Sequence, residues 1–252
     1  MALAAGLTVA LRASPAAPSP LSTLISALAR TSAQNYTFSL DSTTMAAGNK
    51  RDSDLASGAF DPGRGLGTEQ LTIRSARLTA QAQIRFIGGH LYTWVSPGSG
   101  LAKLAKPWDE SASAAASAAG MPPGDAYGFV SDQPVGPNEL AALLQAAGAT
   151  ARDAGSASGQ GWHGTEYTFT AVLGGGQENV SGTVYVDEQG MVRREVTTTA
   201  EKPGGGLPTA AVILTTDRDL TFGGFGAPVS VTAPPPSQVT YTSGKPYWGF
   251  AF

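Results

Sequence analysis

The sequence of 252 residues contains no cysteine, which excludes disulfides, thiolate chemistry and a zinc–thiolate site on the chain as given. The same absence excludes a lipid-modified N-terminal cysteine on that chain. Charged residues make up only 14% of the sequence, against roughly 25% in an average soluble domain. The net charge is −3 and no basic cluster occurs, so nucleic acid is not expected as a partner.

The sequence also lacks a hydrophobic run long enough to cross a bilayer. Met1–Leu11 is apolar, but it is shorter than the roughly 20 residues that a membrane-spanning helix needs. Arg12 ends this run, and small residues and prolines follow it. The run is similar to the hydrophobic part of a secretory signal, without the basic residues that normally precede it. We therefore expect residues 1–18 to form either a signal-like segment or a flexible N-terminus.

The chain is instead rich in turn formers, with 32 Gly and 17 Pro, which indicates many turns rather than long helices. Two segments nevertheless carry a clear helical pattern. The first begins at Ser19-Pro20, and its apolar stripe consists of Leu21, Leu24, Ile25 and Leu28. The second begins at Pro137 or Asn138 and ends at Gly148, and its stripe consists of Leu140, Leu143, Leu144 and Ala147.

Most of the remaining apolar runs predict antiparallel strands. The runs before the second helix are Tyr36–Thr44, Leu55–Phe60, Leu71–Arg77, Gln81–Ile87 and His90–Val95. The runs after it are Thr165–Leu173, Val180–Val186, Met191–Thr199, Ala210–Thr216 and Leu220–Phe222, with Val229–Thr232 and Pro234–Pro236 closing the domain. Gly88-Gly89 and the Asp-Glu-Gln-Gly turn that ends at Gly190 predict tight hairpins.

The middle of the chain differs from the rest. Leu101–Lys106 predicts one or two helical turns that Pro107 ends, and Ser111–Ala119 predicts a weak helix or a disordered crossing. A helix, a set of strands, a helical insert and a second set of strands together predict an α+β fold with one curved antiparallel sheet. We expect this domain to span residues 19–238, followed by a C-terminal tail over residues 239–252.

Six motifs in this order are similar to those of a known family. They are YTFSLDST, AQIRFIGGHLYTWV, NELAALLQAAG, GWHGTEYTFTAVL, GTVYVDEQGMVRREV and LTFGGFGAPVSVTAPPPSQV, which together cover roughly residues 20–238. The chain thereby resembles the LolA/LprG-like lipoprotein carriers, in particular the actinobacterial LppX/LprA/LprF/LprG branch. That branch normally carries a lipid-anchored cysteine, which this chain lacks.

The resemblance implies a half-barrel sheet packed against a few helices around an apolar cavity that holds acyl chains or a lipid anchor. It also implies a location in the cell envelope and no catalysis. A curved sheet too large for its own side chains to fill must enclose ligand or water, whereas an ordinary packed core is the alternative for each apolar residue. The candidate cavity wall consists of Ile84, Phe86, Tyr92, Trp94, Trp108, Met121, Phe129, Leu143, Tyr167, Phe169, Val184, Ile213 and Phe222.

The sequence does not contain a constellation that predicts catalysis, a cofactor or a metal. GQGWHG matches the dinucleotide-binding pattern by its letters, but a strand-like run follows it where a helix would be needed. His90 and His163 each stand alone at the start of a strand. Asp187, Asp217 and Asp219 are expected in turns, because aspartate stabilises turns through its own backbone. We therefore expect a protein that is not an enzyme.

The C-terminal tail is rich in aromatic residues, namely Tyr247, Trp248, Phe250 and Phe252. Such a segment costs solubility when it is exposed, so it needs a surface to cover or a partner. It could be a last edge strand or plug over the open mouth of the sheet, a segment that occupies the cavity until ligand displaces it, or a carried peptide that is modified or cleaved.

Two functions follow from these features. The first is an extracytoplasmic carrier, in the envelope or secreted, that binds lipid or a lipidated molecule and meets a membrane surface or an envelope protein. The second is a scaffold or precursor protein whose aromatic C-terminal peptide is the recognised, modified or cleaved element.

Overall fold

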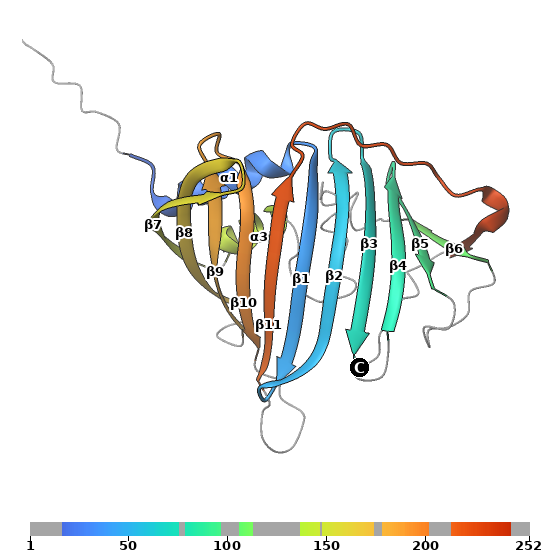
Figure 1. The fold of residues 1–252 in the computed structure, drawn as a ribbon, viewed down its shortest axis with the longest axis horizontal. Helices are drawn as coiled ribbons and strands as arrows, with labels where there is room; N and C mark the ends of the chain where they lie inside the picture. The colour runs from blue at the N-terminus through green and yellow to red at the C-terminus, as the bar shows by residue number, and fades with distance from the viewer. Residues whose placement is uncertain are drawn as a thin grey trace, which may run out of the picture.

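The computed structural model describes residues 17–75, 79–96, 106–112, 137–146, 148–173, 178–201 and 213–242. These residues form a large sheet with few helices (Figure 1). The helices are α1 (Pro20–Ser32), α3 (Pro137–Ala146) and the short 3-10 helix η2 (Pro236–Gln238). The strands are β1 (Tyr36–Ala46), β2 (Asn49–Asp61), β3 (Leu66–Ser75), β4 (Thr79–Ile87), β5 (His90–Val95), β6 (Trp108–Ala112), β7 (Thr150–Gly159), β8 (Trp162–Leu173), β9 (Glu178–Asp187), β10 (Val192–Glu201), β11 (Leu214–Gly223) and β12 (Val239–Thr242).

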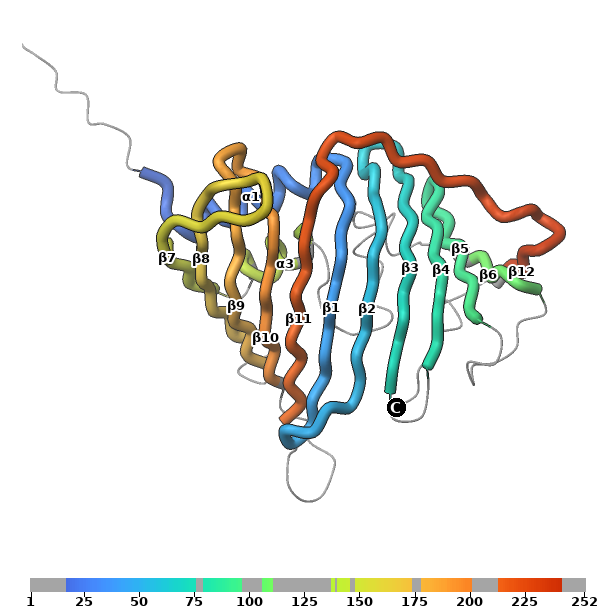
Figure 2. Tube along the Cα trace, in the orientation of Figure 1, coloured from blue at the N-terminus to red at the C-terminus, as the bar shows by residue number. Residues whose placement is uncertain are grey.

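All twelve strands belong to one sheet, in the order β12-β6-β5-β4-β3-β2-β1-β11-β10-β9-β8-β7. Neighbouring strands are antiparallel except β12 and β6, which run parallel. The pairing of β1 with β11 joins the strands before α3 to those after it. β7 and β12 are the two edges, so the sheet is not closed into a barrel (Figure 2). The predicted combination of a large, mostly antiparallel sheet with few helices is confirmed.

The first helix begins where the sequence predicts. The Ser19 hydroxyl accepts a hydrogen bond from the backbone N–H of Ser22 at 3.2 Å, and Pro20 occupies the first helical position. Leu24 and Leu28 are fully buried, because their side of α1 packs against β7–β10 and α3. The second predicted helix is also confirmed, with Leu140, Leu143 and Leu144 buried. Gly148 follows it with a φ of 57°, a backbone conformation that favours glycine.

The predicted hairpins form with the expected backbone. Gly88 and Gly89 have φ values of 58° and 86° and join β4 to β5 in a two-residue turn. Gly190 has a φ of 76° in the turn between β9 and β10.

The β9–β10 turn is organised by the buried carboxylate of Asp187. Its Oδ1 accepts hydrogen bonds from the backbone N–H groups of Gln189 at 3.0 Å and Met191 at 2.8 Å. Its Oδ2 lies 2.6 Å from Nε of Arg193. The same turn is tied to α1, because Arg30 donates to the Gln189 carbonyl at 2.7 Å. The prediction that Asp187 is a turn residue is thus confirmed.

Two predictions about local structure are wrong. Ser111–Ala112 lie at the end of β6 rather than in a weak helix or a disordered crossing, and residues 113–119 lie outside the described residues. Asp217 and Asp219 lie within the continuous strand β11, which replaces the expected pair of strands separated by a turn. Val229–Thr232, expected to close the domain, lies in the connection from β11 to η2 and is not a strand. Residues 101–105 and 210–212 of other predicted elements also lie outside the described residues.

Residues 224–235 form an extended connection from β11 to η2 at the top of the sheet (Figure 1). Arg64 donates to the carbonyl of Val229 at 3.3 Å, and Arg85 donates to that of Thr232 at 2.8 Å. The connection leads to β12, which pairs with β6 from Trp108 onward. The first four residues of the segment expected to be a tail, 239–242, thus lie in the sheet.

We predict that Asp187→Ala lowers the free energy of unfolding by about 3 kcal/mol, because two backbone donors and the Arg193 guanidinium lose a buried acceptor. Urea denaturation measures this change. The matched control is Asp219→Ala, which removes the half-exposed ion pair with Arg194 and should cost less than about 1 kcal/mol. Equal losses in the two variants would contradict the role of Asp187.

Candidate functional site

The register of the strands separates two faces of the sheet. Directly paired residues point to the same side, so each row of partners across the sheet lies on one face. We call the face covered by α1 and α3 the inner face, and the opposite one the outer face. One row on the inner face is almost entirely apolar and consists of Glu195, Leu220, Leu40, Ala56 and Leu71. The next row is mostly polar and consists of Thr197, Arg218, Ser42, Asp54 and Ile73.

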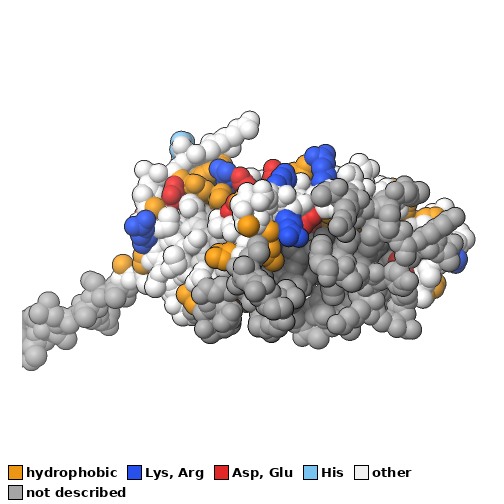
Figure 3. Space-filling view, turned by 90° about the horizontal axis from the view of Figure 1, so that it is seen from below, with side chains coloured by type: hydrophobic (Ala, Val, Ile, Leu, Met, Phe, Trp, Pro, Cys, Tyr) orange, Lys and Arg blue, Asp and Glu red, His pale blue; other side chains and the backbone are white. Residues whose placement is uncertain are grey.

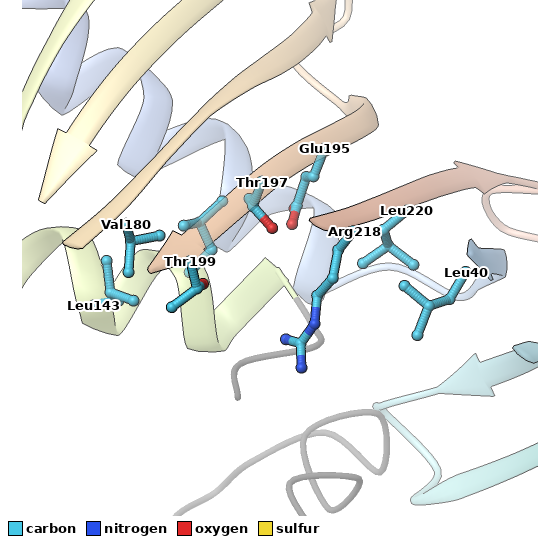
Figure 4. A pocket seen from close by; sticks show the side chains of 9 residues that line it. Leu40, Leu143, Val180, Glu195, Thr197, Thr199, Arg218 and Leu220 are labelled. Carbon is cyan, nitrogen blue, oxygen red and sulfur yellow. The ribbon is translucent and has the colours of Figure 1, made fainter. Parts of the chain in front are cut away.

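A pocket lies where these two rows meet α3 (Figure 4). Its volume is about 20 Å³, which is space for little more than one water molecule. It is lined by Leu140 and Leu143 of α3 and by Leu40, Val180, Glu195, Thr197, Thr199, Arg218 and Leu220 of the sheet. The wall is therefore apolar on the helix side and mixed on the sheet side.

Glu195 and Arg218 place charged groups in this pocket. Both side chains are buried, with exposed fractions of 5% and 6%. They come from adjacent strands, β10 and β11, and Figure 4 shows the Arg218 guanidinium pointing away from β11. The pocket thus combines hydrocarbon with a cation and an anion, which is the lining that an amphipathic molecule requires.

Asp54 extends the polar row beyond Ser42, away from Arg218. Desolvation by burial, reinforced by the nearby carboxylate of Asp52, raises the pKa of Asp54 to about 6. The positive charge of Arg218 opposes this rise in pKa.

Seven residues of the predicted cavity wall lie in the buried core on the inner side of the sheet. They are Ile84, Phe86, Leu143, Tyr167, Phe169, Val184 and Phe222. Of these, Leu143 also lines the pocket. Their burial brings them together in one apolar cluster, and Val184 of this cluster pairs directly with Glu195.

Other predicted wall residues are not brought to that cluster. Tyr92, Trp94 and Trp108 lie on the outer face, because Tyr92 pairs with Arg85 while its neighbour Leu91 pairs with the inner-face residue Phe86. Ile213 is 51% exposed and precedes β11. Met121, Phe129 and the tail residues Tyr247, Trp248, Phe250 and Phe252 lie outside the described residues.

The sequence analysis missed most of the pocket. Arg218 stands between Asp217 and Asp219, which were expected in a turn, so it was not expected in a strand. Its spacing of two and four residues from Leu220 and Phe222 places it on their face of β11. Glu195 lies within the predicted strand Met191–Thr199, but nothing in the sequence marks it as a pocket residue. Leu40, Val180 and Leu220 were expected in strands, but nothing in their local pattern marks them as pocket residues.

The two histidines occupy different environments. His90 Nδ1 lies 2.8 Å from Glu110 Oε1, a carboxylate that is 20 positions away in the sequence. His163 is exposed on β8. Among the described residues, no group of three His, Asp or Glu side chains is arranged to hold a metal ion.

Among the described residues seen from below in Figure 3, charges of the two signs do not gather into separate patches. Basic and acidic side chains alternate there with hydrophobic ones. In the described part of the chain, no helix is both long and apolar enough to cross a membrane.

No protein-family model matches the sequence, and no curated protein matches it. Solved structures with a similar chain trace include MucB in complex with MucA(peri), at a TM-score of 0.35 and 14% identity over 86% of this chain and 58% of that chain. A DUF1329 family protein from Desulfovibrio piger matches at a TM-score of 0.30 and 9% identity, over 85% of this chain and 96% of that one.

A LolA superfamily protein from Nitrosomonas europaea matches at a TM-score of 0.25 and 10% identity, over 88% of this chain and 97% of that one. A LolA superfamily member is thus among the similar structures, while the LprG branch is not identified. The chain spans little more than half the length of the MucB chain, 58%. TM-scores this low assign neither a ligand nor a partner to this chain.

We predict that Asp54→Asn changes how stability depends on pH. The folded-state pKa of about 6 lies above the ordinary value of 3.8, so the unfolded chain ionises first as the pH rises. The wild type therefore loses stability between about pH 4 and pH 6 relative to Asp54→Asn, by about 2 kcal/mol. Urea denaturation at pH 4 and pH 7 measures this, with pH 4 as the baseline. A difference between the two proteins that stays constant over this range would contradict the prediction.

Proposed function

We propose that this protein is a non-enzymatic carrier that binds a hydrophobic ligand, a lipid or a lipidated molecule, between α3 and the inner face of the sheet. The observation that carries the proposal is the two-sided apolar wall of the pocket, with Leu140 and Leu143 on the helix and Leu40, Val180 and Leu220 on the sheet. Glu195 and Arg218 stand at the same pocket. Hydrocarbon would be buried against the leucines, and the polar end of the ligand would lie beside these charges.

The pocket is too small for an acyl chain as it stands, so this function requires the pocket to open. A volume of about 20 Å³ cannot hold an acyl chain, so the ligand must separate α3 from the strands beneath it. Burial of hydrocarbon contributes about 0.8 kcal/mol per methylene. A long chain can therefore offset the loss of contacts between the α3 leucines and the sheet. On this proposal α3 is the element that moves when ligand binds.

The similarity of the sequence motifs to LolA/LprG-like carriers supports the same ligand class. It also supports a curved half-barrel that widens into a cavity when loaded, and a place of action outside the cytoplasm, in the cell envelope or as a secreted protein. A carrier of this kind would meet a membrane surface or an envelope protein to collect and release its ligand.

The alternative function rests on the aromatic segment Tyr247–Phe252, which lies outside the described residues. It stays a prediction from the sequence. A chain that ends at Ser243 separates the two functions: lipid binding that persists in this truncated chain supports the carrier, and loss of a partner or of a processing enzyme supports the alternative.

We predict that Leu143→Trp reduces the amount of bound lipid several-fold, because the larger ring fills the pocket between α3 and the sheet. The measurement is native mass spectrometry of protein purified from its own host, followed by organic extraction and identification of the lipid. The matched control is Ala142→Trp, which adds the same ring on the exposed side of α3. Thermal unfolding followed by circular dichroism verifies that both variants fold.

The wild type should carry close to one equivalent of lipid, and Ala142→Trp should carry the same amount. A mass without ligand for both the full chain and the chain ending at Ser243 would overturn the carrier function. Equal lipid loading of folded Leu143→Trp and the wild type would move the binding site away from α3.

A further inference from the structure

The outer face of β4, β5, β6 and β12 carries a cluster of aromatic residues that the inner-face pocket does not explain. The strand pairing places Arg85, Tyr92, Glu110 and Tyr241 in one row across these four strands. The adjacent row consists of Gln83, Trp94, Trp108 and Val239. On the other side of the first row, His90 pairs with Ala112. We call Tyr92, Tyr241, His90, Glu110 and Trp94 the aromatic platform.

Glu110 contacts two of the rings of the platform, those of His90 and Tyr92. One of its carboxylate oxygens lies 2.8 Å from Nδ1 of His90. The rings of His90 and Tyr92 lie nearly parallel, with an interplanar angle of 28° and centroids 6.5 Å apart. Desolvation, together with the neighbouring Glu110, raises the pKa of the Tyr92 phenol, which agrees with a close contact between these two side chains. This part of the platform is thus organised before any ligand arrives.

The platform is accessible to solvent. Tyr241 is 66% exposed, and the side chain of His90 is 53% exposed. Tyr92 and Trp94 are half-buried, whereas Trp108 is buried beneath Arg85, whose guanidinium lies 4.5 Å from the centre of its ring. Arg85 and Glu110 contribute one charge of each sign, so the platform has no strong net charge.

The spacing between strands sets the distance between the two tyrosines of the platform. Tyr92 on β5 and Tyr241 on β12 are separated by β6 alone, so their backbones are roughly 9–10 Å apart, twice the distance between neighbouring strands. This is about the length of two pyranose rings in an extended sugar chain. A sugar ring offers a face of C–H bonds that packs on an aromatic ring and a rim of hydroxyls that hydrogen-bond with carboxylate and imidazole groups.

We propose that the aromatic platform binds an extended oligosaccharide, whose chain crosses β5, β6 and β12 with alternate sugar rings on Tyr92 and Tyr241. Glu110 and His90, between and beside these rings, are the partners of the sugar hydroxyls. Because the platform lies on the outer face, this site is separate from the pocket proposed for lipid. A carrier with both sites could hold its lipid on one face while it is attached to a polysaccharide by the other.

Other ligand classes fit the platform less well. An open sheet face cannot enclose an acyl chain on all sides, as burial of hydrocarbon requires. The single cation on the row, Arg85, is half-buried and gives little attraction for a nucleic acid or an anionic membrane. A sugar chain needs neither enclosure nor net charge, only aromatic faces and hydrogen-bonding groups at the right spacing.

The test uses the full chain and a panel of oligosaccharides, namely hexamers of β-linked glucose and of β-linked N-acetylglucosamine together with an α-linked glucose hexamer. Isothermal titration calorimetry measures the dissociation constant. The wild type should bind at least one hexamer, and Tyr241→Ala and Tyr92→Ala should each weaken that binding about fivefold or more. Tyr241→Trp should retain binding, because it keeps an aromatic face at that position.

The matched control is Tyr185→Ala, which removes another outer-face aromatic that packs near Trp162 and Arg194 at the opposite end of the sheet. Its affinity for the hexamer should equal that of the wild type. Absence of binding to every hexamer by the wild type would overturn the proposal, as would equal loss of affinity in Tyr185→Ala and Tyr241→Ala. Lipid content measured on the same samples should not change in any of these variants, so that failure of this site is distinguished from failure of the carrier function.

Discussion

The alternation of side chains along each β-strand is the constraint on which the rest of this structure depends. The described residues form twelve strands in one sheet. Directly paired residues on neighbouring strands lie on the same face, so the two faces continue from strand to strand. The inner face receives the buried leucines and phenylalanines, and α1 packs against this face over β7–β10. The outer face carries many threonine, serine and charged residues, together with the aromatic platform at one end and Trp162 and Tyr185 at the other. Both proposed sites are consequences of this single division.

The helices are fixed to the sheet at its β7–β10 half, and a buried carboxylate takes part in that attachment. Asp187 satisfies two backbone donors of the β9–β10 turn and pairs with Arg193, which in turn lies 4.7 Å from the ring centre of Phe225. The backbone N–H of Val192, just beyond the turn, donates to the hydroxyl of Thr31 on α1 at 2.8 Å. The turn, the end of α1 and the exit of β11 are thereby held as one unit, while α3 contacts the pocket through apolar side chains. For this reason α3 is the element that moves in the proposed carrier function.

The inner pocket and the outer platform use opposite physical means of recognition. The pocket offers hydrocarbon with Glu195 and Arg218 at its edge, and its small volume requires a helix to move before a ligand can enter. The platform is open, and Glu110 contacts its His90 and Tyr92 rings. An apolar ligand gains most from enclosure, whereas a hydroxyl-rich ligand remains partly hydrated and needs only a shaped surface. One sheet can therefore serve two ligands of different chemistry without competition between them.

The sequence by itself determined the local elements: the start of α1 at Ser19-Pro20, the helix α3, the Gly88-Gly89 turn and the turn closed by Gly190. Each depends on a cap, a periodic stripe or a left-handed backbone, which a few adjacent residues specify. It did not determine β7, whose Gly, Ser and Ala residues have little strand preference and are held by pairing with β8, nor the parallel pairing of β12 with the distant β6. Nor did it separate Tyr92, Trp94 and Trp108 from the inner core. Alternation within a strand shows which of its residues share a face. It does not show which face is covered. That is decided by pairing and packing between residues far apart in the chain.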